Sequence, residues 1–296
     1  MELEDILREV RSLKRKIQHF SGEIESMKAV LREDPLFVER ILRTRGLHVF
    51  RENPTDQLFI PPGLPPSSQT QFYELMKKYS FRLVARDMIK RHDHFHIQEL
   101  THYCSSRVAQ RYADLLSEMG VIVKLGREEY RTSVYPLYSF GPTLEWFIAE
   151  MFKREFASPA IYRVSIKGTA SGGDYDVLSC WDRRLVYVEV KSSPPRGVEL
   201  SEVTAFFSRV EELLPDVAIL FNDTQLRMRD KLVVLFEDEL KQRYGKKAKP
   251  HFPVVRLAGE LFHLQNHIFI INSKKGIVDN FSTCLKHYLR HGERRR

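Results

Sequence analysis

The order of helices and strands expected over residues 142–222 limits the possible folds of this chain more than any other feature. A helix is expected from Pro142 to about Phe156, because apolar residues recur there at helical spacing. Strands are expected where apolar residues alternate or run together. The expected order is that helix, strands over 160–167, 175–180 and 185–191, a helix over 199–214 and a strand over 216–222. It predicts an α/β fold in which helices flank a mixed sheet.

Three charged residues fall on two neighbouring strands of this pattern. Glu189 and Lys191 share one face of their strand, because side chains alternate along a strand. The polar turn over 182–184 predicts a hairpin that brings Asp176 beside Glu189. The strand that carries Glu189 is otherwise apolar, and a charged pair in a central strand is costly unless it is satisfied or functional. A surface Glu-Val-Lys and a turn aspartate are the plainer alternative, and the central position favours function.

These residue types predict a metal-dependent reaction. Two carboxylates at one sheet edge, together with the backbone carbonyl of Val190, offer hard oxygen ligands suited to Mg²⁺ or Mn²⁺. Such an ion stabilises charge on a scissile phosphate and lowers the pKa of a bound water. Lys191 is then expected to orient or activate that water and to neutralise charge in the transition state.

The segment GGDYDVLSCWDRRLVYVEVKSS, residues 172–193, resembles the PD-(D/E)xK nuclease superfamily, which includes restriction endonucleases and archaeal Holliday-junction resolvases. The resemblance covers residues 142–222 and implies a restriction-endonuclease-like sheet and Mg²⁺-dependent phosphodiester hydrolysis. It implies that Asp176 is the strand-two aspartate, and that Glu189 and Lys191 are the E-x-K pair.

Two further carboxylates enter through the same resemblance. It implies that Glu145, in the preceding helix, joins the metal site, and that Asp174 is a peripheral carboxylate on the face of Asp176. Many relatives carry a Gln or a basic residue early in the second helix. That helix has no Gln here, which leaves Arg209 as a possible basic member.

Residues 69–137 are expected to form an α+β winged helix-turn-helix domain that resembles bacterial and archaeal regulators. Helices are expected over 71–90, 97–103 and 107–119, followed by a hairpin wing. The third helix would enter the DNA major groove while the wing reaches phosphates; packing against protein is the alternative, and Glu128 and Glu129 weaken the wing as a phosphate site. The expected contacts are Ser106, Arg107, Gln110 and Arg111 of the helix and Lys124, Arg127 and Arg131 of the wing.

Residues 1–33 carry an a/d heptad pattern over 3–31. It predicts a coiled-coil helix that pairs two copies of the chain, with one amphipathic helix packed on its own chain as the alternative. Residues 34–68 are expected to hold a helix over 36–45, a hairpin of 47–51 with 57–60, and a linker whose Pro-rich sequence covers 61–70. The nuclease-like domain is expected over 138–296. After residue 222 it should hold helices near 229–244 and 280–290 and extended segments over 253–258 and 267–272, which extend the sheet or pack on it.

Composition agrees with a nucleic-acid partner. The formal net charge of +8 favours a polyanion. Three dispersed cysteines without a CxxC argue against a disulfide framework, and no apolar run is long enough for a membrane span, so a cytoplasmic protein is expected.

The sequence thus predicts a dimeric, metal-dependent DNA endonuclease acting in restriction, repair or defence. Three alternatives remain open at this stage. One is a non-catalytic winged-helix DNA-binding regulator, another is a subunit of a larger DNA-processing assembly that docks a protein partner through its N-terminal helix, and the third is RNA as the substrate.

Overall fold

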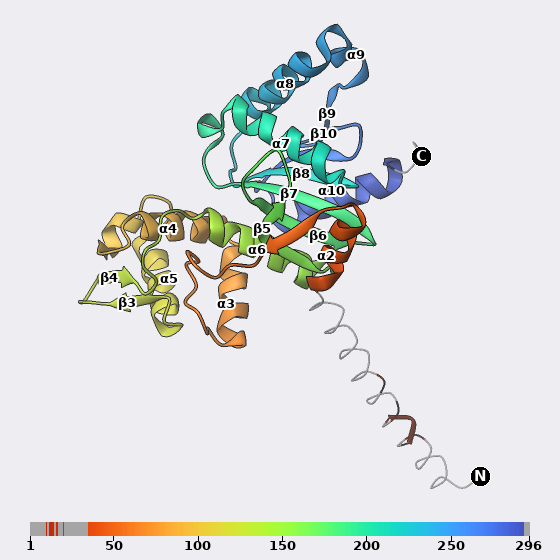
Figure 1. The fold of residues 1–296 in the computed structure, drawn as a ribbon. Coiled ribbons are helices and arrows are strands. Elements are labelled where there is room, and N and C mark those ends of the chain that lie inside the picture. Colours follow the sequence, from red (N-terminus) through yellow and green to blue (C-terminus); the bar gives the residue numbers. More distant parts are fainter. Residues whose placement is uncertain (1–9, 11, 15, 17–19, 21–34, 293–296) are drawn as a thin grey trace.

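The structure is a computed structural model that describes residues 10, 12–14, 16, 20 and 35–292. An eight-stranded mixed sheet forms its centre, with the strand order β1-β5-β6-β7-β8-β11-β10-β9 (Figure 1). In chain order the strands are β1 (His48–Arg51), β5 (Ala160–Lys167), β6 (Tyr175–Trp181), β7 (Arg184–Lys191), β8 (Val217–Asn222), β9 (Val254–Ala258), β10 (Leu261–Leu264) and β11 (Ile268–Asn272).

The direction of pairing changes at β7, near the middle of the sheet. Strands β5, β6 and β7 form an antiparallel meander, in which Val188 of β7 lies opposite Val177 of β6. On its other side β7 pairs with β8 in parallel, and β8 pairs in parallel with β11. The carboxyl ends of β7, β8 and β11 therefore meet at one edge of the sheet, and Lys191 is the last residue of β7 there.

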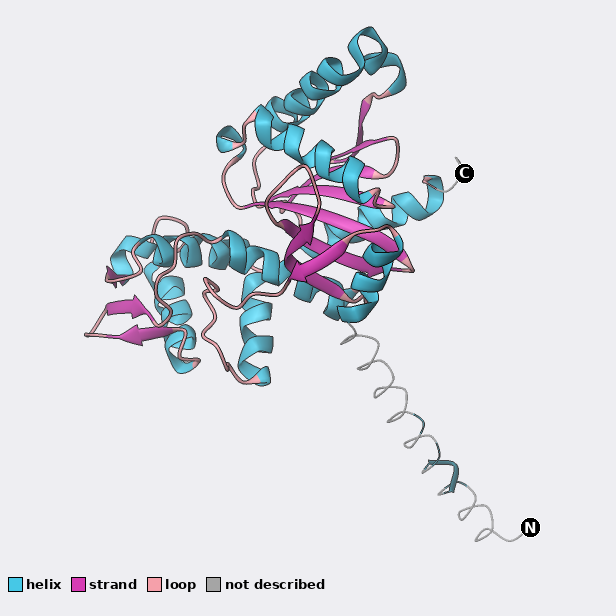
Figure 2. Cartoon of the chain, viewed as in Figure 1, coloured by secondary structure: helices cyan, strands magenta, loops and turns pink. Residues whose placement is uncertain are grey.

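Helices cover both faces of the sheet, which is consistent with the continuous apolar runs of its central strands (Figure 2). One face is buried by α6 (Gly141–Glu155) and α10 (Ile277–His291). The other face is buried by α2 (Pro35–Thr44), α7 (Leu200–Leu213) and α8 (Val234–Tyr244), while the short α9 (Ala248–His251) follows α8.

Residues 66–132 form a separate group of elements beside the sheet, here called the N-terminal module (Figure 1). A three-stranded sheet with the order β2-β4-β3 lies among its helices. The elements are α3 (Pro66–Met76), α4 (Tyr79–Lys90), β2 (Phe95–His96), the 3-10 turn η1 (Ile97–Leu100), α5 (Ser106–Glu118), β3 (Ile122–Lys124) and β4 (Glu129–Thr132).

The elements predicted over 142–222 are confirmed, with ends that shift by at most one residue. The α/β class and the mixed sheet flanked by helices are confirmed as well. The segments after residue 222 do extend the sheet through β11, β10 and β9, although β10 was not expected. The predicted coiled coil over 3–31 falls largely on residues outside those that the structure describes.

The prediction of a hairpin between 47–51 and 57–60 is wrong. Strand β1 instead pairs with β5, more than a hundred residues later. Residues 58–60 are buried without joining a strand, and the amide of Phe59 donates a hydrogen bond of 2.9 Å to Thr143 Oγ1 at the start of α6. The predicted linker over 61–70 also ends early, because α3 begins at Pro66. Proline is favoured at the first position of a helix, where an amide N–H would have no partner within the helix.

The single helix predicted over 71–90 is two helices, and the helix predicted over 97–103 is only the short η1. Lys78 is extended (φ −84°, ψ 122°) and separates α3 from α4. The guanidinium of Arg82 explains the break, because it donates to the carbonyl oxygens of Met76 (2.7 Å) and Lys77 (3.2 Å) at the end of α3.

Arg82 also joins the N-terminal module to the sheet. Its side chain is 1% exposed and forms three hydrogen bonds of 2.8 to 3.0 Å with the fully buried carboxylate of Asp223, which directly follows β8. The amide of Asp223 donates to the carbonyl of Lys191 at 2.8 Å. The buried ion pair of Arg82 with Asp223 therefore connects α4 to the end of β8.

We predict that Arg82→Met lowers the free energy of unfolding by about 3–5 kcal/mol, because it leaves the Asp223 carboxylate buried without its main partner. The double substitution Arg82→Met with Asp223→Leu should recover much of that loss, since neither charge is then buried alone. Denaturant unfolding of the wild type, of each single variant, Arg82→Met and Asp223→Leu, and of the double variant measures both effects. A single variant as stable as the wild type would contradict this account.

Candidate functional site

Glu189 and Lys191 lie side by side on the face of β7 that α7 covers. The side chain of Glu189 is 3% exposed, and its Oε1 lies 3.0 Å from Lys191 Nζ. The same ammonium group lies 2.8 Å from Oε1 of Glu202, in the first turn of α7. Burial alone would lower the pKa of Lys191, but Glu189, Glu202 and Asp176 together raise it above its ordinary value. Lys191 is therefore a cation held between two carboxylates.

The second oxygen of Glu189 is also engaged. Arg209 of α7 donates to Oε2 at 2.8 Å, and the hydroxyl of Tyr187 donates to the same oxygen. These contacts, with that of Lys191, compensate the burial of the Glu189 carboxylate. Sequence spacing contained a signal for both helix partners, because Glu202 and Arg209 are seven residues apart and so share one face of α7.

Asp176 lies at the start of β6, beside the end of β7. Its Oδ2 accepts a hydrogen bond of 2.6 Å from the amide of Val190. Burial raises the pKa of Asp176 well above its ordinary range, and the nearby charges of Glu189 and Glu145 raise it further. The contact made by Val190 is through its amide, and a role for its carbonyl oxygen as a metal ligand stays a prediction.

Glu145 joins this group from the first turns of α6. Burial raises its pKa to about 7; Arg163 opposes the shift, while Glu189 and Asp174 add to it. Asp174 itself precedes β6 and accepts a hydrogen bond from the hydroxyl of Ser165. The structure thus brings Glu189 close enough to raise the pKa values of both Glu145 and Asp176, and Glu145 close enough to raise that of Asp176 further.

The donor chemistry of this cluster fits a divalent cation, because buried carboxylates with raised pKa values are stabilised when a cation replaces their protons. As the side chains stand, no three His, Cys, Asp or Glu side chains in the described residues are arranged to hold a metal ion. The reason at this site is that Glu189 directs its oxygens at Lys191, Arg209 and Tyr187. Metal binding therefore requires Glu189 to exchange partners.

The residues predicted to contact DNA lie on α5 and on the hairpin β3–β4, and most are exposed. Gln110 is the exception, because its amide nitrogen donates to Asp114 (2.7 Å) and to the hydroxyl of Tyr130 (3.0 Å). Gln110 therefore bonds within the module in this conformation, and its contact with DNA stays a prediction. The exposed members are Ser106, Arg107 and Arg111 of α5, with Lys124, Arg127 and Arg131 of the hairpin.

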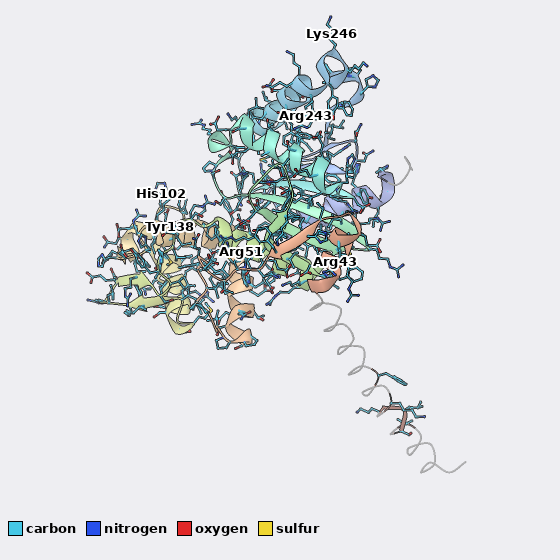
Figure 3. The ribbon with its side chains drawn as sticks, viewed as in Figure 1. Arg43, Arg51, His102, Tyr138, Arg243 and Lys246 are labelled. Atoms are coloured by element: carbon cyan, nitrogen blue, oxygen red, sulfur yellow. The ribbon has the colours of Figure 1, made fainter. Side chains whose placement is uncertain are left out.

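The acidic residues of the hairpin have partners within the N-terminal module. Glu128 lies 3.5 Å from His96 and Glu129 lies 3.8 Å from His94, on the strand β2 side of the small sheet. A second basic run, which includes Lys246, follows α8 at its outer end, and in Figure 3 it lies far from His102 of the N-terminal module. Positive charge is thus present on two separate surfaces.

Comparison with known proteins yields little. No family model matches the chain, and no curated protein matches it. A solved structure, protein VC1899 from Vibrio cholerae, is similar to 68% of this chain with a TM-score of 0.44 and 13% sequence identity. The match spans 55% of that protein, so this chain corresponds to about half of its length. No helix among the described residues has the length and apolar character needed to cross a membrane.

We predict that Glu145→Gln stabilises the protein at alkaline pH and has little effect in acid. The folded state raises the pKa of Glu145 from 4.5 to about 7, so it binds this proton more tightly than the unfolded chain. The wild type therefore loses stability from this group as the pH rises through that interval, and the neutral Gln does not. Thermal unfolding of both proteins at about pH 5 and about pH 8 checks the sign. A difference in Tm that is the same at both pH values would contradict it.

Proposed function

We propose that this protein is a metal-dependent endonuclease of the PD-(D/E)xK type that hydrolyses phosphodiester bonds in DNA. One observation carries the proposal: Glu145, Asp176 and Glu189 meet Lys191 at a single sheet edge, and the pKa values of Glu145 and Asp176 are both raised. Structural ion pairs do not require an excess of buried carboxylates, whereas a site for Mg²⁺ or Mn²⁺ does.

In this proposal Asp176 and Glu189 hold the cation, with Glu145 completing the site from α6. The bound ion supplies charge stabilisation at the scissile phosphate and a more acidic water. Lys191 positions the attacking water and neutralises charge that develops on the phosphate oxygens. Glu202 keeps the Lys191 ammonium at the site when Glu189 turns to the metal, because its carboxylate lies 2.8 Å from Nζ.

The N-terminal module supports DNA as the substrate. We propose that it acts as a winged helix, with α5 as the helix that enters the major groove and β3–β4 as the wing. In favour are the element order helix, strand, turn, helix and hairpin, the pairing of β2 with β4, and the exposed Arg107 and Arg111 on α5. If residues 3–31 pair two copies of the chain, as their heptads predict, each copy would cut one strand of a duplex.

We predict that Asp176→Asn and Lys191→Met each reduce cleavage of plasmid DNA in the presence of Mg²⁺ or Mn²⁺ by at least about 100-fold. Matched controls are Asp182→Asn, in the exposed turn between β6 and β7, and Lys167→Met, at the exposed end of β5. Both controls should cut like the wild type, and a chelator should abolish all cutting. Equal cleavage by the control and the site variants would assign the activity to a contaminant.

We predict that the double substitution Arg107→Gln with Arg111→Gln weakens binding to duplex DNA and makes it less sensitive to salt. Each lost phosphate contact lowers the slope of log K against log salt by about 0.9, so the pair should lower it by up to about 1.8. The double control Arg43→Gln with Lys246→Gln removes the same charge from α2 and from the outer end of α8 (Figure 3). A slope equal to that of the control would exclude α5 from the DNA interface.

A non-catalytic DNA-binding regulator, alone or within a larger assembly, is the alternative. The partners of Glu189 favour it to a limited extent, since three donors already satisfy that carboxylate. The cleavage experiment separates the two proposals: a regulator binds duplex DNA with the α5-dependent salt slope but cuts nothing with any divalent cation.

A further inference from the structure

Two arginines of α4, Arg82 and Arg86, lie within ion-pair distance of Asp223, and only Arg82 forms close hydrogen bonds with it. Arg82 occupies both carboxylate oxygens of Asp223 and the carbonyls at the end of α3. Arg86, one helical turn later, reaches Oδ2 only at 3.5 Å. Its Nε is buried and has no hydrogen-bond partner in the described part of the chain. Among the described residues, Asp223 is also the one carboxylate within ion-pair distance of Arg86.

The charges at this point therefore do not balance. One carboxylate that is fully buried faces two guanidinium groups, and Arg82 already makes the short, bidentate interaction with it. Arg86 keeps a full positive charge that is compensated only weakly, on a side chain that is still 16% exposed. A guanidinium that is partly desolvated and has unused donors is suited to a phosphate, which it can contact with two parallel hydrogen bonds.

The location of Arg86 connects it to the candidate site from two directions. Its guanidinium lies 5.7 Å from the ring centroid of Phe140, the N-cap residue of α6, which is five positions before Glu145. Its partner Asp223 donates its amide to the carbonyl of Lys191. Arg86 thus stands between the start of the helix that carries Glu145 and the end of the strand that carries Lys191.

We infer that Arg86 binds a phosphate of the nucleic-acid backbone next to the phosphate that is cut. The inference rests on the proposed nuclease function and assigns to the N-terminal module a direct part in holding the substrate at the sheet edge. Arg82 is then the structural arginine of the pair, which fixes α4, and Arg86 is the substrate-binding one. Phe140 holds the guanidinium plane in place through a cation–π contact, which leaves the charge available to the phosphate.

The test measures binding of a fluorescent DNA duplex by anisotropy over a range of salt, in the full chain with Asp176→Asn so that the duplex stays intact. Adding Arg86→Gln should weaken binding about tenfold and lower the salt slope by about 0.9, and Arg86→Lys should keep most of the slope because it keeps the charge. Arg43→Gln, which removes one exposed charge on α2, should leave both quantities unchanged. Thermal unfolding of each variant identifies any that is not folded.

Each outcome decides the matter. Unchanged binding in a folded Arg86→Gln variant would show that Arg86 serves only Asp223 and would overturn the inference. A loss of slope that is equally large with Gln and with Lys would do the same, because a merely structural arginine depends on its shape rather than on its charge. If Arg86→Gln does not fold, Arg86→Met, which also removes the charge but keeps an apolar stem, is measured in its place against the same two outcomes. If the parent neither binds nor, with Asp176 restored, cuts DNA, the proposed function itself fails.

Discussion

The burial of the Glu189 carboxylate is the constraint on which the rest of the site depends. An ionised carboxylate that loses its water costs several kcal/mol unless partners replace the lost hydration. The strand cannot supply enough of them, since its neighbours on that face are Tyr187 and Lys191 alone. Helix α7 supplies the remainder through Arg209, and through Glu202 it also holds Lys191. The position of α7 against the sheet is therefore set by charge compensation as well as by the apolar contacts of Phe206.

Asp223 is a second buried carboxylate, and its contacts join two parts of the molecule. Asp223 directly follows β8, where its amide bonds to the carbonyl of Lys191 and its side chain binds Arg82. The module that carries α5 is thus fixed to the same sheet edge at which the carboxylates meet. These contacts, together with the packing of Phe72 and Tyr73 of α3 on Trp146 and Phe147 of α6, hold the module against the sheet.

The local part of this architecture could be predicted from sequence, while most of the long-range part could not. Strand β5 was identified because its apolar residues alternate, and α5 because Ser105 caps it and its Oγ accepts from the amide of Val108. The partner of β1 could not be identified, since periodicity defines a strand but not the strand beside it. No glycine or proline in the sequence marks the break between helices at Lys78. The break depends on Arg82, whose position depends on Asp223, 141 residues away.

The candidate site shows the same limit. Asp176, Glu189 and Lys191 were predicted from two adjacent strands joined by a short turn, which leaves few ways to pair them. Glu145 came only through a family resemblance, and its place beside Asp176 depends on how α6 crosses the sheet. The internal bonds of Gln110 could not be foreseen, because its helical position alone places it among exposed neighbours. Arg86 carries no sequence signal at all, since an arginine in a helix is ordinary unless the contact with Asp223 is known.

In the proposed nuclease, the balance of charge at the sheet edge would link proton binding to metal binding. Four carboxylates meet there, from Glu145, Asp176, Glu189 and Glu202, and Lys191 and Arg209 oppose them. With these six groups ionised the cluster carries an excess of two negative charges, which adds to the burial that raises the pKa values of Glu145 and Asp176. Protons or one divalent cation can remove this excess, so the two must compete for the same carboxylates.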